Sequence, residues 1–268
     1  MNDLSPGYKG NVLLKKTNQN IEWTPDLVQE YMKCQQDPVY FTETYMKIIS
    51  INEGLTSFNM YEYQKDMVRS FKENRYSIVT TARQAGKSTT TCAFILWYII
   101  FNPDKTVALL ANKGDTAREI LGRVQLAYQH LPKWLQQGVK EFRAGAMVLE
   151  NNSRVIAAAT SSDAIRGYSI NMLFIDEAAF TKPNMMDIWN RSIQPTLLDY
   201  MGSATALSNT NGVDQDNFFW RICNEPDALH AWRILTLCGA NLTHVVQFFF
   251  APGIACTGID LHHHPPTT

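Results

Sequence analysis

The hydrophobic pattern of the chain changes near Tyr76. Before it, apolar residues recur at three- and four-residue spacing, and Thr24 followed by Pro25 is typical of a helix start. This pattern predicts one helix from there, a second after Pro38, and helical structure up to about Leu55. We expect these helices to form a small subdomain packed on the rest of the chain.

After residue 76, short apolar runs rich in β-branched residues alternate with longer segments of helical period. The longer segments predict helices at 87–101 and 116–131. Strands that alternate with helices are typical of a mainly parallel sheet covered on both faces. Two strand-like runs within 146–159, on either side of Asn151-Asn152, predict a hairpin inserted in this pattern. The predicted buried strands are 77–81, 106–111, 171–176 and 203–208.

The last stretch, from about residue 229, has almost no charge and no clear period. It contains three consecutive aromatic residues at 248–250 and three consecutive histidines at 262–264 beside prolines. A proline-flanked histidine trio is more typical of an unstructured tail than of a metal site. We therefore leave 229–268 unassigned, with a disordered and a non-native tail as the alternatives to a folded segment.

Composition narrows the class of protein. The 268 residues allow one large domain or two small ones, and 24 Lys+Arg against 25 Asp+Glu give a net charge of −1. Overall basicity, the simplest sign of a nucleic-acid binder, is absent, so contacts to DNA would need a local patch or another chain. Five scattered cysteines without a C-x-x-C pair are typical of a reducing cytosol, and no apolar run is long enough to span a bilayer.

The sharpest chemical motif lies between the first predicted strand and the helix after it. A phosphate-binding loop needs inward backbone N–H groups at a helix start, a lysine that reaches the phosphates and a hydroxyl for Mg²⁺. Gly86-Lys87-Ser88 supplies the last three positions of the GxxxxGK[ST] motif, whereas Thr81 replaces its first glycine. Alone, the octet could also be an exposed strand-to-helix turn. The whole segment is Thr81, Ala82, Arg83, Gln84, Ala85, Gly86, Lys87 and Ser88.

Two further strands end in polar residues. The apolar run from Met172 ends in Asp176 and Glu177, where Asp176 would hold Mg²⁺ and Glu177 would orient and deprotonate an attacking water. The strand 203–208 ends in a polar cluster that can sense a γ-phosphate, although the same residues are common in turns. A loop motif and an acidic strand end in this order make a chance match the weaker explanation.

From about Tyr61 to Phe219, these motifs resemble in order and spacing the N-terminal ATPase half of the large terminase subunit of tailed bacteriophages. Tyr61–Met67 looks like the adenine-recognising Q motif, and the family commonly lacks the first glycine of the loop. The resemblance implies an α/β P-loop NTPase fold of the RecA-like (ASCE) type, a mainly parallel β-sheet flanked by helices, with a small helical N-terminal subdomain. It also implies ATP and Mg²⁺ as cofactors, and hydrolysis that powers translocation of double-stranded DNA into a procapsid.

The resemblance also implies roles for individual residues. Arg83 within the loop, or Arg166 reaching a neighbouring subunit, would act on the γ-phosphate region, and Glu177 would be the catalytic base. Tyr63 and Gln64 would contact the adenine, residues 81–88 would bind the phosphates, Ser88 and Asp176 would hold the metal, and Ser208, Asn209 and Thr210 would couple hydrolysis to motion.

The predicted division is a helical subdomain at 1–58, an ATPase core at 59–228 and an unassigned tail at 229–268. Large terminases continue into an RNase H-like nuclease domain, for which too few residues follow Gly212, so we expect no nuclease activity from this chain. The implied partners are the portal protein, the small terminase subunit, further copies in a ring, and double-stranded DNA bound weakly, in the host cytoplasm and without a membrane. The alternatives are a helicase- or recombinase-like DNA-dependent ATPase and a truncated terminase that binds nucleotide without turnover.

Overall fold

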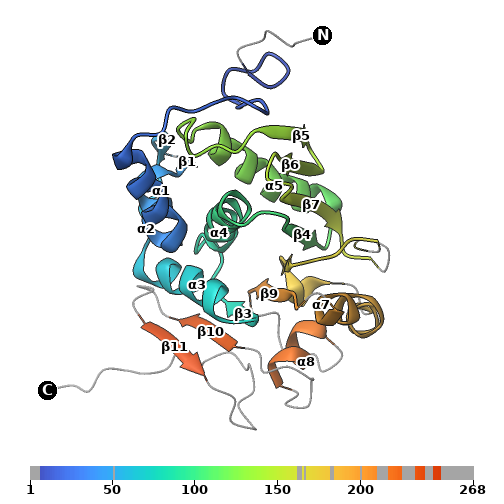
Figure 1. The fold of residues 1–268 in the computed structure, drawn as a ribbon. Coiled ribbons are helices and arrows are strands. Elements are labelled where there is room, and N and C mark those ends of the chain that lie inside the picture. The colour runs from blue at the N-terminus through green and yellow to red at the C-terminus, as the bar shows by residue number, and fades with distance from the viewer. Residues whose placement is uncertain are drawn as a thin grey trace, which may run out of the picture.

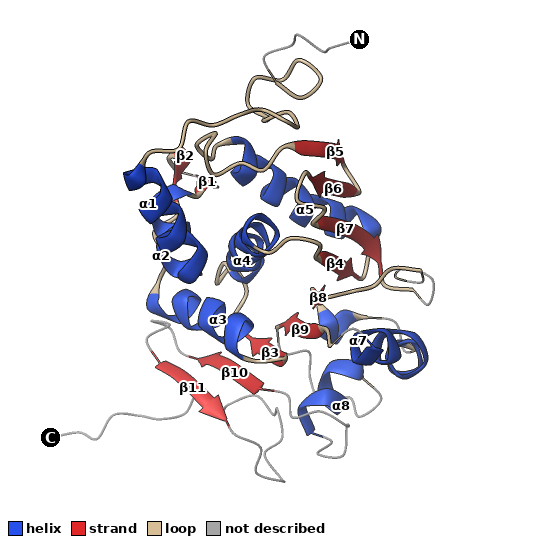
Figure 2. Ribbon diagram, in the orientation of Figure 1, coloured by secondary structure: helices blue, strands red, loops and turns tan. Residues whose placement is uncertain are grey.

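The structure is a computed structural model that describes residues 7–50, 52–161, 165, 167–181, 184–199, 201–209, 217–224, 233–238 and 244–248. A large sheet runs through the molecule, with helices on either side of it (Figures 1 and 2). Within the described ranges it has nine strands, in the spatial order β11 (His244–Phe248), β10 (Arg233–Cys238), β3 (Tyr76–Thr80), β9 (Ser203–Ser208), β8 (Met172–Ile175), β4 (Thr106–Ala111), β7 (Arg154–Ala159), β6 (Ala146–Leu149) and β5 (Val139–Arg143).

The strands from β10 to β7 run parallel to their neighbours, whereas β11 at one edge and β6 and β5 at the other are antiparallel. The mainly parallel sheet predicted from the alternation of strands and helices is therefore confirmed. The predicted hairpin around Asn151-Asn152 is β6 paired with β7. Strand β9 lies between β3 and β8, so all three carboxyl ends open on the same edge of the sheet.

Burial on both faces explains why the parallel strands read as continuous apolar runs. In β4, Val107 and Leu109 pack in one hydrophobic cluster with α3 (Glu62–Glu73), α4 (Lys87–Phe101) and α5 (Gly114–Gln129). The alternate residues Ala108 and Leu110 pack in a second cluster with α6 (Met185–Ile188), α7 (Gln194–Asp199) and α8 (Phe218–Asn224). A π-helical turn, Trp189–Ile193, joins α6 to α7. The sheet thus holds the ends of its central strands between two packed layers.

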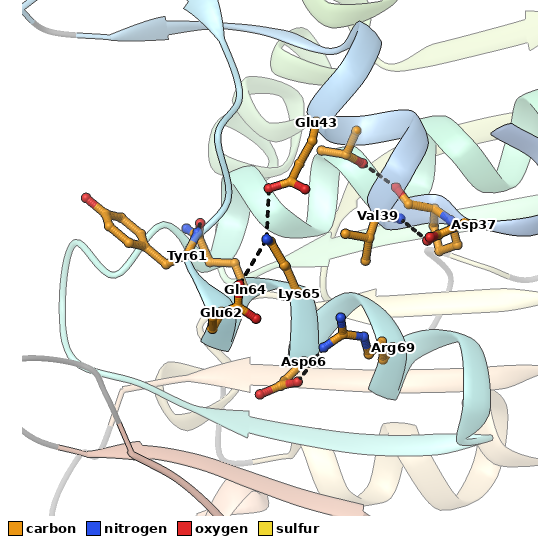
Figure 3. A network of polar contacts seen from close by, with 11 residues as sticks. Asp37, Val39, Glu43, Tyr61, Glu62, Gln64, Lys65, Asp66 and Arg69 are labelled. Atoms are coloured by element: carbon orange, nitrogen blue, oxygen red, sulfur yellow. Dashed lines mark hydrogen bonds and ion pairs between the residues drawn. The ribbon is translucent and has the colours of Figure 1, made fainter. Parts of the chain in front are cut away.

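The two predicted N-terminal helices are present as α1 (Pro25–Gln36) and α2 (Pro38–Tyr45), and Thr24 Oγ1 accepts a hydrogen bond from the backbone N–H of Leu27 at 3.3 Å. Both helices contribute to the cluster that surrounds α4. Figure 3 shows Lys65 of α3 between Glu43 of α2, at 3.1 Å, and Glu62 of its own helix, at 3.0 Å. These partly exposed ion pairs add little stability and orient α3 against α2.

The expectation of helical structure up to Leu55 is wrong at its end and near its start. Residues 7–23 form turns and bridges, and residues after α2 form an antiparallel hairpin of β1 (Lys47–Ser50) and β2 (Gly54–Ser57). Gly54 has a φ of +68°, which a right-handed helix does not allow and a tight turn requires. The segment 47–57 is therefore a β-hairpin and not the expected helix.

The stretch after residue 229, left unassigned from the sequence, contains two strands within the described residues. β10 pairs in parallel with β3, the strand that precedes the predicted phosphate loop, and the side chain of Leu235 is 1% exposed. β11 then pairs with β10. The Phe248–Phe250 run lies only partly, and the histidine trio not at all, within the described residues. Among the helices of the described part, none has both the length and the apolar character that crossing a bilayer requires.

Candidate functional site

The predicted phosphate loop connects the end of β3 to the first residue of α4. Every residue of β3 is buried, so the loop starts from a fixed point in the sheet. Gly86 sits at the start of α4 with a φ of +73°, and a Cβ built on it would lie 2.5 Å from Nε2 of Gln64. Both the left-handed backbone and this close approach therefore require glycine. The loop ends with backbone N–H groups at the N-terminus of a 15-residue helix, which favours an anion there.

Side chains of α3 hold this loop from the side. The Tyr63 hydroxyl donates to the Ala85 carbonyl at 2.9 Å, and Gln64 Nε2 approaches the same oxygen at 3.4 Å. Gln64 Oε1 accepts from the backbone N–H of Tyr61 at 3.0 Å, so both ends of the amide are engaged. Burial raises the pKa of Tyr63, which keeps its hydroxyl protonated as a donor. The two residues predicted to contact adenine thus lie beside the loop, and their polar groups bond to its backbone.

The exposed aromatic ring at this place is Tyr61, which the sequence reasoning quoted only as part of a motif. Its side chain is 68% exposed, and its ring stacks on Tyr63 at 5.6 Å with an angle of 8° between the planes. In Figure 3 its phenol group points away from the polar side chains of α3. Its place as the first aromatic residue of the quoted motif, Tyr61–Met67, was the available signal.

The two predicted metal ligands meet. Ser88 Oγ, in the first turn of α4, donates to Asp176 Oδ2 at 3.1 Å, although the two residues come from different strand ends. Asp176 is 6% exposed and follows β8 directly. Hydroxyl and carboxylate oxygens are ligand types that Mg²⁺ takes together with phosphate oxygens. The described residues contain no group of three His, Cys, Asp or Glu side chains able to hold a metal by themselves.

Glu177 occupies a strained turn next to Asp176. Its φ of +54° and ψ of +40° lie in the left-handed region, which costs a residue with a side chain about 1–2 kcal/mol. Its backbone N–H donates to Asp176 Oδ1 at 3.0 Å, and its carbonyl accepts from the N–H of Phe180 at 2.8 Å, closing the short 3₁₀ turn η1 (Ala178–Phe180). The Glu177 side chain is exposed, so this turn presents a carboxylate beside the buried one.

The end of β9 touches both of the other strand ends. Lys87 Nζ donates to Asn209 Oδ1 at 2.9 Å, and the backbone N–H of Thr81 donates to the Ser208 carbonyl at 3.2 Å. Ser208 Oγ, fully buried, accepts from the backbone N–H of Ala179 at 3.1 Å. Two of the predicted coupling residues, Ser208 and Asn209, therefore lie between the loop and the turn that carries Glu177.

The remaining predicted residues are less constrained or lie outside the described ranges. Arg83 is exposed in the loop, as are Ala82 and Gln84, and Gln84 has a φ of +62°. Arg166 and Thr210 fall outside the described residues. Asn217 was not among the predicted residues. Its position directly before the apolar run of α8 is the sequence signal of a helix cap.

A phosphate loop on β3, an acidic end on β8 and β9 inserted between them define the P-loop fold of the RecA-like type. The family model for the N-terminal part of the T4-like virus type of terminase large subunit matches residues 78–187, which include both motifs. This match confirms the predicted resemblance to large terminase subunits and supports the predicted role as the ATPase of a packaging motor.

Two solved structures show the same fold. The large terminase ATPase domain of Thermus phage P74-26, in a point-mutant form, is 21% identical with a TM-score of 0.51, over 61% of this chain and 69% of that one. The large terminase of bacteriophage HK97 is 15% identical with a TM-score of 0.56, over 68% of this chain and 39% of that one. At these identities the likeness confirms the predicted fold class.

Proposed function

We propose that this chain binds Mg²⁺ and ATP where β3, β8 and β9 end, and hydrolyses the ATP to drive double-stranded DNA into a viral procapsid. One observation carries this proposal: the Ser88–Asp176 contact at 3.1 Å and the Lys87–Asn209 contact at 2.9 Å join the three strand ends. A helix N-terminus, a lysine, a hydroxyl and a carboxylate then lie together, and phosphoryl transfer depends on positioned groups of these kinds.

In the proposed reaction, Lys87 and the backbone N–H groups of the loop bind the phosphates. Ser88 and Asp176 hold the Mg²⁺, which neutralises charge on the phosphates when bound. Glu177 orients a water and accepts its proton while the water oxygen bonds to the γ-phosphorus and the bond to ADP breaks. Arg83 in the loop, or Arg166 from a neighbouring copy, would stabilise the charge that develops on the γ-phosphate.

For the base of the nucleotide, we propose that Tyr61 supplies the stacking surface at the start of α3. Tyr63 and Gln64 are buried and hydrogen-bond to the Ala85 carbonyl, so we propose that they hold the phosphate loop in place and that the base stacks on Tyr61 instead. We also propose that the ATPase core starts near residue 59 and that β10 belongs to it, since β10 pairs with the loop strand β3.

We propose that the chain binds the portal protein, the small terminase subunit and further copies of itself in a ring; the family match supports these partners. The match covers only 39% of the HK97 terminase. We therefore propose, and do not take from that match, that this chain contributes to the activity of an assembled motor.

The test is steady-state ATP turnover by this chain, with and without duplex DNA. We expect Mg²⁺-dependent phosphate release that Lys87→Ala abolishes and that Lys9→Ala, a distant exposed control, leaves unchanged. Turnover that survives Lys87→Ala would contradict the site.

Two further readouts separate the alternatives. Unwinding of tailed duplexes would favour a helicase-like enzyme, and nucleotide binding without phosphate release at any protein concentration would favour a non-catalytic fragment. A rise of specific activity with protein concentration, together with activity that is recovered when Arg166→Ala and Glu177→Gln chains are mixed, would favour an arginine donated between copies.

A further inference from the structure

The turn that carries Glu177 is held at Ala179 from two sides. The backbone N–H of Ala179 donates to Ser208 Oγ at 3.1 Å, and its carbonyl accepts from Asn217 Nδ2 at 2.6 Å. Ala179 is 3% exposed, so neither backbone group has ready access to water in place of these partners. Ser208 ends β9 and Asn217 precedes α8, so two elements outside β8 fix this one residue.

Asn217 makes contacts with both of its polar atoms. Its Oδ1 accepts from the backbone N–H of Phe219 at 2.9 Å and approaches that of Trp220 at 3.4 Å, which is the bonding of a helix N-cap. Its Nδ2 is the atom that holds Ala179. One side chain therefore ties the first turn of α8 to the turn after Asp176.

α8 is itself fixed in the second hydrophobic cluster. Phe218 packs on Trp189 with 5.7 Å between the ring centroids, and Ile222 is 1% exposed. A displacement of α8 would therefore move Asn217 with it. Figure 1 shows α8 on the side of the sheet opposite α4.

Glu177 depends on this turn for its backbone conformation. The left-handed φ of +54° is stabilised by the bond from Phe180 N–H to the Glu177 carbonyl, which spans Ala179. A residue holds such a conformation only while its surroundings impose it. Release of the Ala179 carbonyl would remove one of the contacts that impose it.

We propose that Asn217 is a positioning residue for the hydrolysis: it holds the Ala179 carbonyl, and so keeps the Glu177 carboxylate where it can act on the attacking water. This rests on the proposed function, because it takes Glu177 as the catalytic base. It also makes the position of α8 a determinant of turnover, because the same asparagine caps that helix.

The test separates the two contacts of Asn217. Asn217→Asp and Asn217→Ser keep an oxygen that can cap α8, but the carboxylate has no proton to donate and the serine is too short to reach Ala179. We expect kcat to fall about three- to tenfold, the loss of roughly one hydrogen bond, with little change in the dissociation constant for ADP. Amide exchange in a peptide spanning 176–181 should become faster in the nucleotide-free protein.

The matched control is Thr24→Ala, which removes the helix cap of α1 far from the site. It should lower stability to a similar extent and leave kcat unchanged. An Asn217→Asp chain with the kcat and amide exchange of the wild type would overturn the proposal, as would an equal loss of kcat in Thr24→Ala. If the wild type does not hydrolyse ATP, the proposed function fails, and the exchange measurement still decides whether Asn217 holds the turn.

Discussion

Replacement of Gly86 by alanine tests how the phosphate loop is built. Gly86 combines a φ of +73° with a Cβ position only 2.5 Å from Nε2 of Gln64. Gln64 cannot swing away freely, because its amide bonds to the Tyr61 N–H and approaches the Ala85 carbonyl. The added methyl group must therefore distort the loop or break these contacts.

The expected cost has two parts. A left-handed alanine costs about 1–2 kcal/mol, and the loss of Gln64 contacts costs about 1–2 kcal/mol more. A total of about 2–4 kcal/mol would lower the melting temperature of a chain of this size by about 5–15 °C. In a Gln64→Ala background the Gln64 side chain no longer blocks the added methyl group, so the second part of the cost should disappear. The further loss of stability caused by Gly86→Ala should then be about 1–2 kcal/mol.

The assay is chemical unfolding of the wild type, the two single variants and the double variant. Gly122→Ala is the matched control, because Gly122 lies within α5 and nothing lies within 4 Å of the added methyl group. There alanine should raise stability by up to about 1 kcal/mol. Losses from Gly86→Ala and Gln64→Ala that simply add would refute the idea that α3 supports the loop through this contact.

Three other predictions follow from individual contacts. Tyr61→Ala should weaken binding of ATP and ADP about fivefold or more and leave that of tripolyphosphate unchanged, measured by calorimetry; equal weakening of all three would contradict stacking of the base. Asn209→Asp should weaken ATP binding, because a carboxylate would pair with Lys87 and repel the phosphates, and the loss should shrink as salt rises. Burial raises the pKa of Cys34 and of Cys92 to about 12. The folded state therefore keeps both thiols protonated at pH values where the unfolded chain has lost these protons, so the free energy of unfolding should fall as pH rises from about 9 toward 12. Both thiols should also resist alkylation in the native protein.

The elements that the sequence predicted best are those whose signals are local. The segments 106–111, 203–208 and 87–101 have the predicted bounds, because each apolar run is bounded by polar or turn residues. The strand of the phosphate loop and the helix after β4 are displaced by one or two residues. β10 was missed because its partner β3 lies more than 150 residues earlier in the chain, and pairing over that distance leaves no periodic signal.

The site shows the same division. Motifs predicted that Ser88 and Asp176 would meet, because both follow strands of one parallel sheet. They could not predict which atoms Tyr63 and Gln64 contact, since this depends on how α3 packs beside the loop. An asparagine before an apolar run indicates a helix cap at Asn217, but no motif predicts its contact with Ala179, because folding alone brings these two residues together.

The central claim is that Glu177, held in its turn beside Asp176, is the base of an ATPase site. The most direct test compares single-turnover ATP hydrolysis by the wild type, Glu177→Gln and the exposed control Glu119→Gln, with ATP binding measured on the same samples. We predict that Glu177→Gln lowers the rate by about 10²–10⁴-fold with ATP still bound, whereas Glu119→Gln matches the wild type. A Glu177→Gln chain that hydrolyses ATP at the wild-type rate would contradict the account.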